Sequence, residues 1–191
     1  MKITEDLLPI NEYSRPGKKI SEYLAVILHW TGNPISTARQ NRAFFADRAR
    51  GTLGYGSAHY IIDFTGEIIR CIPDDEVAYH CGSSRIDPKS GKVYTDWARE
   101  HFGKYAEYYK TNSPNNCTLG IEMCTMDDIG NFRDVTIDQA ADLTAHLCKT
   151  HGIKLVGTHN MVVGWKDCPR LWVTHPNLFD NFVTAVKERI A

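Results

Sequence analysis

One apolar run constrains the fold more than any other stretch of this chain. Residues 24–30 are Leu-Ala-Val-Ile-Leu-His-Trp, with no alternation of apolar and polar side chains. Such a run is typical of a β-strand that other elements cover on both faces. It ends in Thr31-Gly32-Asn33-Pro34, a sequence that favours a loop. The chain is therefore expected to fold around a buried central strand.

Other segments also have the composition of strands. Residues 58–64 and 67–72 are apolar runs separated by Thr65-Gly66, and two such runs around a two-residue glycine turn predict a β-hairpin. Residues 118–123 form another buried strand, and residues 155–156 belong to a short one. These segments supply neighbours for the central strand.

Helices are expected between the strands. The first begins at Ser36, whose hydroxyl can cap it, and ends near residue 50, just before Gly51. Phe44 and Phe45 are expected to face the interior from this helix. An aromatic-rich helix is predicted for residues 95–110, capped by Thr95.

Two more helices are predicted towards the end of the chain. Thr136-Ile137-Asp138-Gln139 has the form of a capping box and predicts a helix that ends at Gly152. Residues 176–190 have apolar side chains at helical spacing. Strands and helices alternate, while one strand pair is a hairpin. The predicted class is therefore α/β, with a central mixed β-sheet flanked by helices.

Length and charge limit what kind of protein this is. The 191 residues fit one domain, which we expect to span residues 1–191 and to be monomeric, with an extended arm over residues 1–20. A formal net charge of −1 argues against nucleic acid as a partner. No apolar run approaches the length of a membrane span. Acidic residues stand near the N-terminus where a signal peptide needs an apolar core, so synthesis is expected to leave the chain in the cytoplasm.

Three residues that bind soft or borderline metals stand at informative places. His29 ends the first apolar run, His159 follows residues 155–156, and Cys168 lies nine positions after His159. Two imidazoles and one thiolate are the protein ligands that a catalytic zinc ion needs, because its fourth position stays open for water. Zinc can lower the pKa of that water to about 7. The three residues together predict a zinc hydrolase.

Each of these residues also has a less specific interpretation. A lone histidine after a strand is more often a structural residue with satisfied hydrogen bonds. The zinc ion can also be structural, in which case a fourth protein ligand such as Cys81 or Cys117 closes the site. The six cysteines include no C-x-x-C pair, and reduced thiols are the default in such a chain.

Glu122 and Lys166 are the candidate catalytic residues. Glu122 interrupts the apolar strand at residues 118–123, and a buried carboxylate needs a partner or a raised pKa. It is a candidate general base, or alternatively a strand-end glutamate paired with an arginine. Lys166 precedes Cys168 by two positions and is a candidate to stabilise an oxyanion, or alternatively a solvated loop residue.

Together these segments resemble a known family, the type 2 N-acetylmuramoyl-L-alanine amidases, which share a fold with the peptidoglycan recognition proteins. The similarity covers roughly residues 20–190 and is greatest to catalytic domains of phage and prophage endolysins. The matching segments, in chain order, are His29-Trp30-Thr31, Ser57-Ala58-His59-Tyr60-Ile61-Ile62-Asp63, His80-Cys81-Gly82, Leu119-Gly120-Ile121-Glu122 and Lys166-Asp167-Cys168-Pro169.

The resemblance implies a reaction and assigns roles to residues. The reaction is hydrolysis of the amide between the lactyl group of N-acetylmuramic acid and the L-alanine of the peptidoglycan stem peptide. The zinc ligands match His29, His159 and Cys168, the catalytic glutamate matches Glu122, and the oxyanion lysine matches Lys166. Lying in matching segments, His59 and His80 are expected to bind substrate or, alternatively, to orient a ligand.

Three departures from the patterns of particular relatives refine this expectation. Some short phage amidases have a tyrosine at the place of Ala58 and lack the glutamate, so this chain resembles the branch that uses glutamate. Many intracellular relatives have aspartate at the place of Cys168. Residues 83–116 are longer than in compact relatives, which predicts an insertion at the substrate groove, and no wall-binding domain is expected.

Other roles stay open at this stage. The chain is expected to be a phage or prophage endolysin that reaches the wall after release by a holin. It is alternatively a host amidase for wall recycling, sporulation or germination. A recognition module that has lost catalysis is the third interpretation, although such relatives typically lack the cysteine that matches Cys168.

Overall fold

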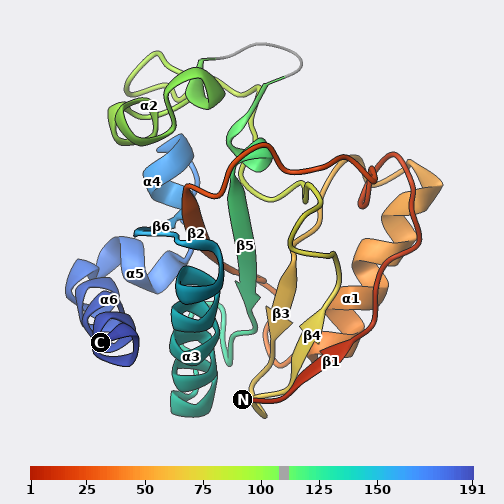
Figure 1. The fold of residues 1–191 in the computed structure, drawn as a ribbon, viewed down its shortest axis with the longest axis vertical. Coiled ribbons are helices and arrows are strands. Elements are labelled where there is room, and N and C mark those ends of the chain that lie inside the picture. The colour runs from red at the N-terminus through yellow and green to blue at the C-terminus, as the bar shows by residue number, and fades with distance from the viewer. Residues whose placement is uncertain (108–111) are drawn as a thin grey trace.

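A mixed β-sheet is the centre of the computed structural model, which describes residues 1–107 and 112–191 (Figure 1). All paired strands are parallel except β3 and β4, which form the predicted hairpin. The predicted α/β class with a mixed sheet is therefore confirmed. In order across the sheet, the strands are β1 (Ile3–Glu5), β4 (Ile68–Arg70), β3 (Tyr60–Ile62), β5 (Thr118–Met123), β2 (Ala25–Trp30) and β6 (Leu155–Thr158).

The apolar run at residues 24–30 forms the predicted central strand. β2 lies between β5 and β6, and its residues 25–28 are completely buried. A strand with a parallel neighbour on each side and helices on both faces has no polar face, so its sequence does not alternate.

Helices cover both faces of the sheet (Figure 1). On one face, α3 (Asp134–His151), α5 (Arg170–Thr174) and α6 (Pro176–Ile190) pack on the largest apolar cluster. On the other face, α1 (Ala38–Asp47) packs against β3 and β4, while α2 (Asp96–Phe102) and α4 (His159–Val163) lie at the β2 end. This second face carries the candidate site.

The start of α1 differs from the prediction. Its N-cap is Thr37, which forms a capping box with Gln40, whereas the Ser36 hydroxyl donates to the carbonyl of Asn33. Phe45 is buried as predicted, but Phe44 is 46% exposed. Adjacent helical residues point in directions about 100° apart, so both rings cannot face the same core. A 3-10 turn (η1, Arg48–Arg50) follows, and Gly51 ends it with a φ of 78°.

The start of α3 was also predicted wrongly. The helix begins at Asp134, so Thr136 lies in its first turn rather than at its cap. Thr136 is completely buried, and its hydroxyl donates to the carbonyl of Asp63 in the β3–β4 connection, 3.0 Å away. A tertiary hydrogen bond has replaced the capping role. The end of the helix at Gly152 is as predicted, with a φ of 69°.

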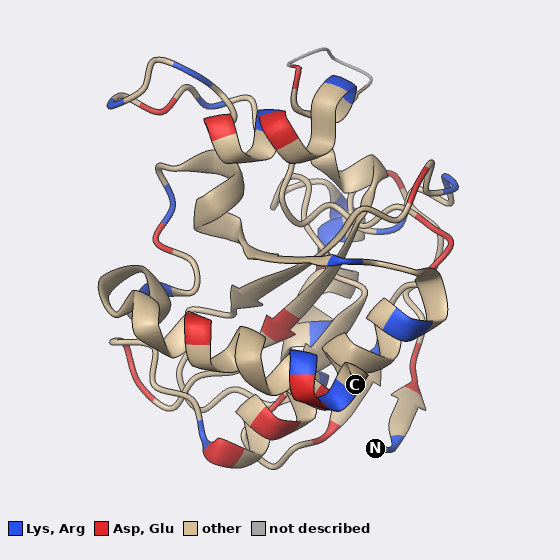
Figure 2. Cartoon of the chain, turned by 60° about the vertical axis from the view of Figure 1, so that its left-hand side comes forward, with Lys and Arg blue, Asp and Glu red and all other residues tan. Residues whose placement is uncertain are grey.

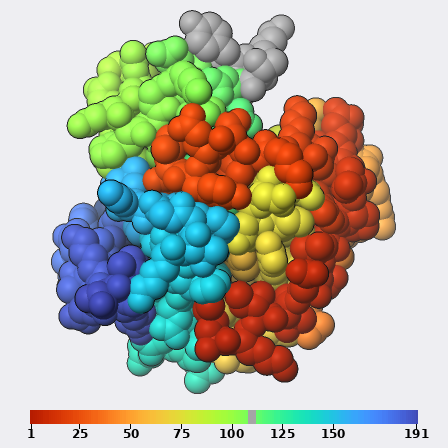
Figure 3. Space-filling model, viewed as in Figure 1, coloured from red at the N-terminus to blue at the C-terminus, as the bar shows by residue number. Residues whose placement is uncertain are grey.

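The first twenty residues lie along one side of the molecule (Figure 3, red). Within them, Ile3–Glu5 pairs with Ile68–Arg70 as the edge strand β1, which the sequence did not predict. Arg15 and Glu76 form an ion pair at 2.8 Å that joins this segment to the rest of the fold. A strand of three residues is too short to show periodicity, so its pairing is a tertiary event.

Residues 83–107 fold into a lobe above the β2 end of the sheet (Figure 3, green). Thr95 caps α2 as predicted, but this helix ends at Phe102 and a 3-10 turn (η2, Gly103–Ala106) follows. The predicted helical residues 108–110 lie outside the described residues. A second 3-10 turn (η3, Pro114–Asn116) leads into β5.

Charged residues of both signs are interspersed over the helices and loops in Figure 2. This pattern agrees with the formal net charge of −1. Within residues 1–107 and 112–191, no helix is long and apolar enough to cross a membrane.

Candidate active site and metal centre

The three predicted ligands meet at the carboxyl end of β2. His29 is the penultimate residue of β2, His159 begins α4 directly after β6, and Cys168 lies in the loop before α5. The Nδ1 atoms of His29 and His159 are 3.0 Å apart, and the Cys168 Sγ is 3.8 Å from the His29 Nδ1. All three ligand atoms lie within 4.8 Å of one another. The structure thus joins residues from three separate parts of the chain.

The geometry of this group fits a zinc ion. Ligand atoms in a tetrahedral zinc site are roughly 3.3–3.6 Å apart, given zinc–nitrogen and zinc–sulfur bonds of about 2.0 and 2.3 Å. The two separations from the His29 Nδ1, 3.0 and 3.8 Å, lie close to these values. Cys81 and Cys117 are not in the group, because their sulfurs contact Thr118 and the Pro114 carbonyl instead. A site with three donors leaves one tetrahedral position open.

The electrostatics of the three donors also suit a cation. Burial is the main cause that lowers the pKa of His29 and His159 well below the usual histidine value, so both rings are neutral, as ligands must be. Burial, and then the charge of Glu122, raises the pKa of the Cys168 thiol to about 12. A thiol in such a place ionises only beside a positive charge, which a bound metal would provide.

Glu122 lies beside His29 in the sheet. The β2–β5 register pairs these two residues directly, so their side chains leave the same face. The Glu122 Oε2 is buried and has no hydrogen-bond partner, and no ion pair involves Glu122 within the part of the chain that the structure describes. Burial raises the pKa of Glu122 to about 7, although nearby Lys166 and Arg48 oppose this shift. The arginine-paired alternative therefore does not describe this residue.

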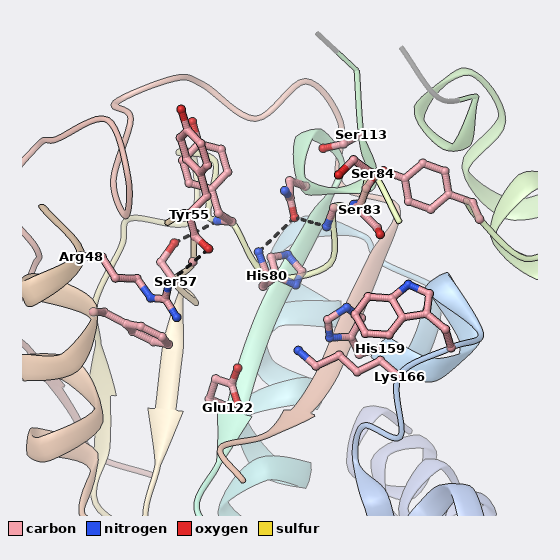
Figure 4. Close-up of a pocket in the computed structure, with 17 residues that line it drawn as sticks. Arg48, Tyr55, Ser57, His80, Ser83, Ser84, Ser113, Glu122, His159 and Lys166 are labelled. Atoms are coloured by element: carbon pink, nitrogen blue, oxygen red, sulfur yellow. Dashed lines mark hydrogen bonds between the residues drawn. The ribbon is translucent and has the colours of Figure 1, made fainter. Parts of the chain in front are cut away.

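His159, Glu122 and Lys166 line a cleft of about 500 Å³. Figure 4 shows Lys166 and His159 on one side of it, Arg48 on the other and Glu122 at the base. A second hollow of about 580 Å³ shares Arg48, Glu122 and Lys166 with the first and extends to Trp30. The end of the cleft near the 83–107 lobe is polar, lined by Ser83, Ser84, Ser113, Asn115 and Tyr94, whereas Ser57 lies on the Arg48 side (Figure 4).

The sequence did not point to Arg48 or to the serines of the cleft. Arg48 lies at the end of the first helical segment, where a positive side chain normally faces water. Its Nη1 donates to the carbonyls of Leu53, Gly54 and Tyr55 at 2.6, 3.1 and 3.3 Å, and its guanidinium lies over the Phe44 ring. No local pattern encodes these contacts, which depend on how the 53–56 loop folds back.

His59 and His80 occupy different positions relative to the cleft. His59 is completely buried, its Nδ1 accepts from the Gly120 N–H at 2.9 Å, and its Nε2 lies 2.9 Å from the Glu76 carbonyl. No atom of His59 is therefore exposed for direct contact with a ligand. His80 lines the cleft, and its Nδ1 lies 3.0 Å from the Nε2 of His29.

Comparison with known proteins defines the class. Residues 20–171 match the family of N-acetylmuramoyl-L-alanine amidases, and the chain belongs to this family. A Bacillus licheniformis protein named as a probable N-acetylmuramoyl-L-alanine amidase is 34% identical over 175 residues, which are 91% of this chain and 44% of that protein. The amidase BlyA of Bacillus subtilis strain 168 is 30% identical over 190 residues, 98% of this chain and 47% of BlyA. The chain thus spans less than half the length of these relatives.

Solved structures support the same fold. The catalytic domain of XlyA superposes with a TM-score of 0.66 at 22% identity, with 97% of this chain and 99% of that one covered. The PlyG catalytic domain gives a TM-score of 0.70 at 19% identity, with 100% and 96% covered. The predicted resemblance, in family and in fold, is therefore confirmed.

Proposed function

We propose that this chain is the catalytic domain of a zinc-dependent N-acetylmuramoyl-L-alanine amidase. It hydrolyses the amide between the lactyl group of N-acetylmuramic acid and the L-alanine of the stem peptide. The observation that carries the proposal is the buried group of His29, His159 and Cys168, which reaches a cleft through His159 and Glu122 in a chain of this family. When bound, zinc supplies a Lewis acid that lowers the pKa of water to about 7 and polarises the substrate carbonyl.

Glu122 carries the proton in this mechanism. It accepts a proton from the attacking water as the water oxygen bonds to the carbonyl carbon of the amide. It then delivers that proton to the nitrogen as the C–N bond breaks, which leaves a lactyl carboxylate and the free amino group of L-alanine. A pKa of about 7, caused by burial, suits a group that must both accept and return a proton near neutral pH.

Lys166 stabilises the negative charge that forms on the carbonyl oxygen. Its side chain lines the cleft from the loop between α4 and α5, on the same side as His159 (Figure 4). It forms no ion pair within the described residues, so its ammonium group is available to a ligand. A charge positioned before the reaction is the usual source of such stabilisation.

The cleft suits a substrate with a sugar part and a peptide part. The serine-rich end beside the 83–107 lobe offers hydroxyl groups to the hydroxyl and acetamido groups of the sugar. The hollow that reaches Trp30 and Phe44 offers aromatic surface beside Arg48, which fits a peptide that bears carboxylates. Residues 83–107 and 112–116 are thus proposed to shape the groove.

The biological setting is part of the proposal. A phage or prophage endolysin that acts on the cell wall is supported by the likeness to the catalytic domains of XlyA and PlyG. A host amidase of wall recycling, sporulation or germination would use the same site. We propose that residues 1–191 act as one catalytic unit.

The reaction is tested on purified peptidoglycan. The protein should release peptides that begin with a free L-alanine amino group, and it should create no new reducing sugar ends. The matched control is Glu122→Gln. This variant should be almost inactive, and its zinc content should equal that of the wild type. New reducing ends without new amino groups would indicate a glycosidase and overturn the proposal. Binding to walls without any cleavage would indicate a recognition module instead.

A further inference from the structure

The cleft-lining residue His80 directly contacts a candidate metal ligand. Its Nδ1 lies 3.0 Å from the Nε2 of His29, the nitrogen that faces away from His159 and Cys168. Its Nε2 lies 3.1 Å from the Thr118 hydroxyl and 3.3 Å from the Thr118 carbonyl. His80 thus uses both ring nitrogens inside the protein.

The hydrogen bonds of Thr118 determine which groups donate and which accept in this chain of contacts. The Thr118 hydroxyl donates to the Pro114 carbonyl at 2.7 Å, so its oxygen accepts from the His80 ring. The Thr118 carbonyl is also an acceptor only. The proton of a neutral His80 ring therefore lies on Nε2, and its Nδ1 presents a lone pair.

That lone pair determines the state of His29. The His80 Nδ1 can only accept, so the His29 Nε2 carries the proton and donates it across the 3.0 Å contact. The Nδ1 of a neutral His29 is then unprotonated, and its lone pair points to His159 and Cys168. This is the tautomer that a metal ligand requires at this atom.

The fold holds the His80 ring in place from two sides. The ring lies directly on Gly120 of β5, where a Cβ atom would be only 2.6 Å from the His80 Cγ. The Oδ1 of buried Asn115 accepts the backbone N–H groups of His80, Cys81 and Gly82 at 3.1, 2.9 and 3.0 Å. Both devices restrict the loop that carries the ring.

We propose that His80 is a positioning residue that fixes the tautomer and the ring plane of His29, through the chain Thr118–His80–His29, instead of contacting substrate. This inference rests on the proposed metal centre for its purpose, but the tautomers themselves do not require a metal. Partners of this kind raise the affinity of a metal ligand because the ligand is already oriented before binding.

The tautomers are tested in metal-free protein by imidazole ¹⁵N and ¹H NMR at a pH where the rings are neutral. We expect His29 and His80 each to carry the proton on Nε2. A proton on the Nδ1 of His29 or of His80 would overturn the inference. The result does not depend on amidase activity, so failure of the proposed reaction leaves this test intact.

Two matched substitutions then test the effect on metal binding. In His80→Asn the side-chain oxygen replaces the Nδ1 acceptor, whereas in His80→Gln the amide nitrogen replaces only the Nε2 donor. We expect His80→Gln to weaken zinc affinity, measured by competition with a chelator, about 10–100-fold, and His80→Asn to restore most of it. The Co²⁺-loaded His80→Gln protein should also have an altered visible absorption spectrum.

His59 provides the control for general damage to the core. It is at least as buried as His80, and its ring lies 5.8 Å from the His80 ring, but its partners are backbone groups and no candidate ligand. His59→Asn should lower the melting temperature while zinc affinity per folded molecule stays near that of the wild type. Equal losses of zinc affinity in His59→Asn, His80→Asn and His80→Gln would overturn the proposal.

Discussion

Two glycines in neighbouring strands of this sheet lie in the same row but serve different regions. In the register, Ile27 of β2 pairs with Gly120 of β5 on one side and with Gly157 of β6 on the other. A Cβ atom at Gly120 would lie 2.6 Å from the His80 ring, and one at Gly157 would lie 2.6 Å from the Trp97 ring. Each glycine thus provides a notch in which an aromatic ring rests on the sheet.

The rings of His80 and Trp97 support different parts of the molecule. His80 rests in the Gly120 notch and reaches His29, which follows Ile27 by two residues and leaves the same face. Trp97 belongs to α2, so the Gly157 notch holds the 83–107 lobe that forms one wall of the cleft. The notch at Gly120 thus supports the candidate metal centre, and the notch at Gly157 supports the groove.

The largest effect is expected at Glu122, the proposed proton carrier. It follows Gly120 by two residues in β5 and lies beside His29. Glu122→Gln removes the proposed proton carrier while it preserves shape. Turnover of a muramoyl-peptide should fall about 10²–10⁴-fold, with zinc content unchanged. The measurement is turnover per folded, zinc-loaded molecule. Near-wild-type turnover would remove Glu122 from the mechanism.

Gly120→Ala tests the metal side of the comparison. The added methyl group displaces the His80 ring and, with it, the orientation of His29. Zinc affinity, measured by chelator competition, should fall about 10–100-fold. If the Gly120→Ala protein binds zinc as tightly as the wild type, the close approach of His80 to Gly120 does not support the metal centre.

Gly157→Ala is the matched substitution on the groove side. Its methyl group meets Trp97, so the lobe must shift, and the free energy of unfolding should fall by about 1–3 kcal/mol. Zinc affinity should remain within a few-fold of wild type, while KM for a muramoyl-peptide should rise. A loss of zinc affinity as large as that of Gly120→Ala would contradict the separation of the two regions.

The smallest effect concerns the pH dependence of stability. The pKa of Glu122 is raised by burial from an ordinary value of 4.5 to about 7, so between these pH values the folded protein binds more protons than the unfolded chain. The free energy of unfolding of the wild type therefore falls as the pH rises from 4.5 to 7, because the carboxyl group then ionises in the unfolded chain but not while it is buried in the folded protein. In metal-free protein, Glu122→Gln should gain stability relative to wild type over that range, as measured by urea denaturation. If the difference in free energy of unfolding between Glu122→Gln and wild type does not change with pH, the pKa of Glu122 is not raised.

Several features of this protein were determined by its sequence alone. The apolar run at residues 24–30 predicted the central strand, Thr65-Gly66 predicted the hairpin turn, and Gly152 predicted the end of α3. These predictions succeeded because burial and chain termination depend on local side chains and on backbone freedom at glycine. The convergence of His29, His159 and Cys168 also followed from residue types at strand ends and from the family resemblance.

Other features were decided only by the tertiary structure. Thr136 has the local form of a cap but bonds to Asp63, and Phe44 has the hydrophobicity of a core residue but remains exposed. His80 stands in a segment that predicted either substrate contact or orientation of a ligand, and the tertiary structure places its ring against His29 and Thr118. Thr136 and His80 bond to residues that are distant in the sequence, and Phe44 lies on the solvent side of its helix. Local patterns carry no information on strand register, and register is what places Gly120 beneath His80 and beside Ile27.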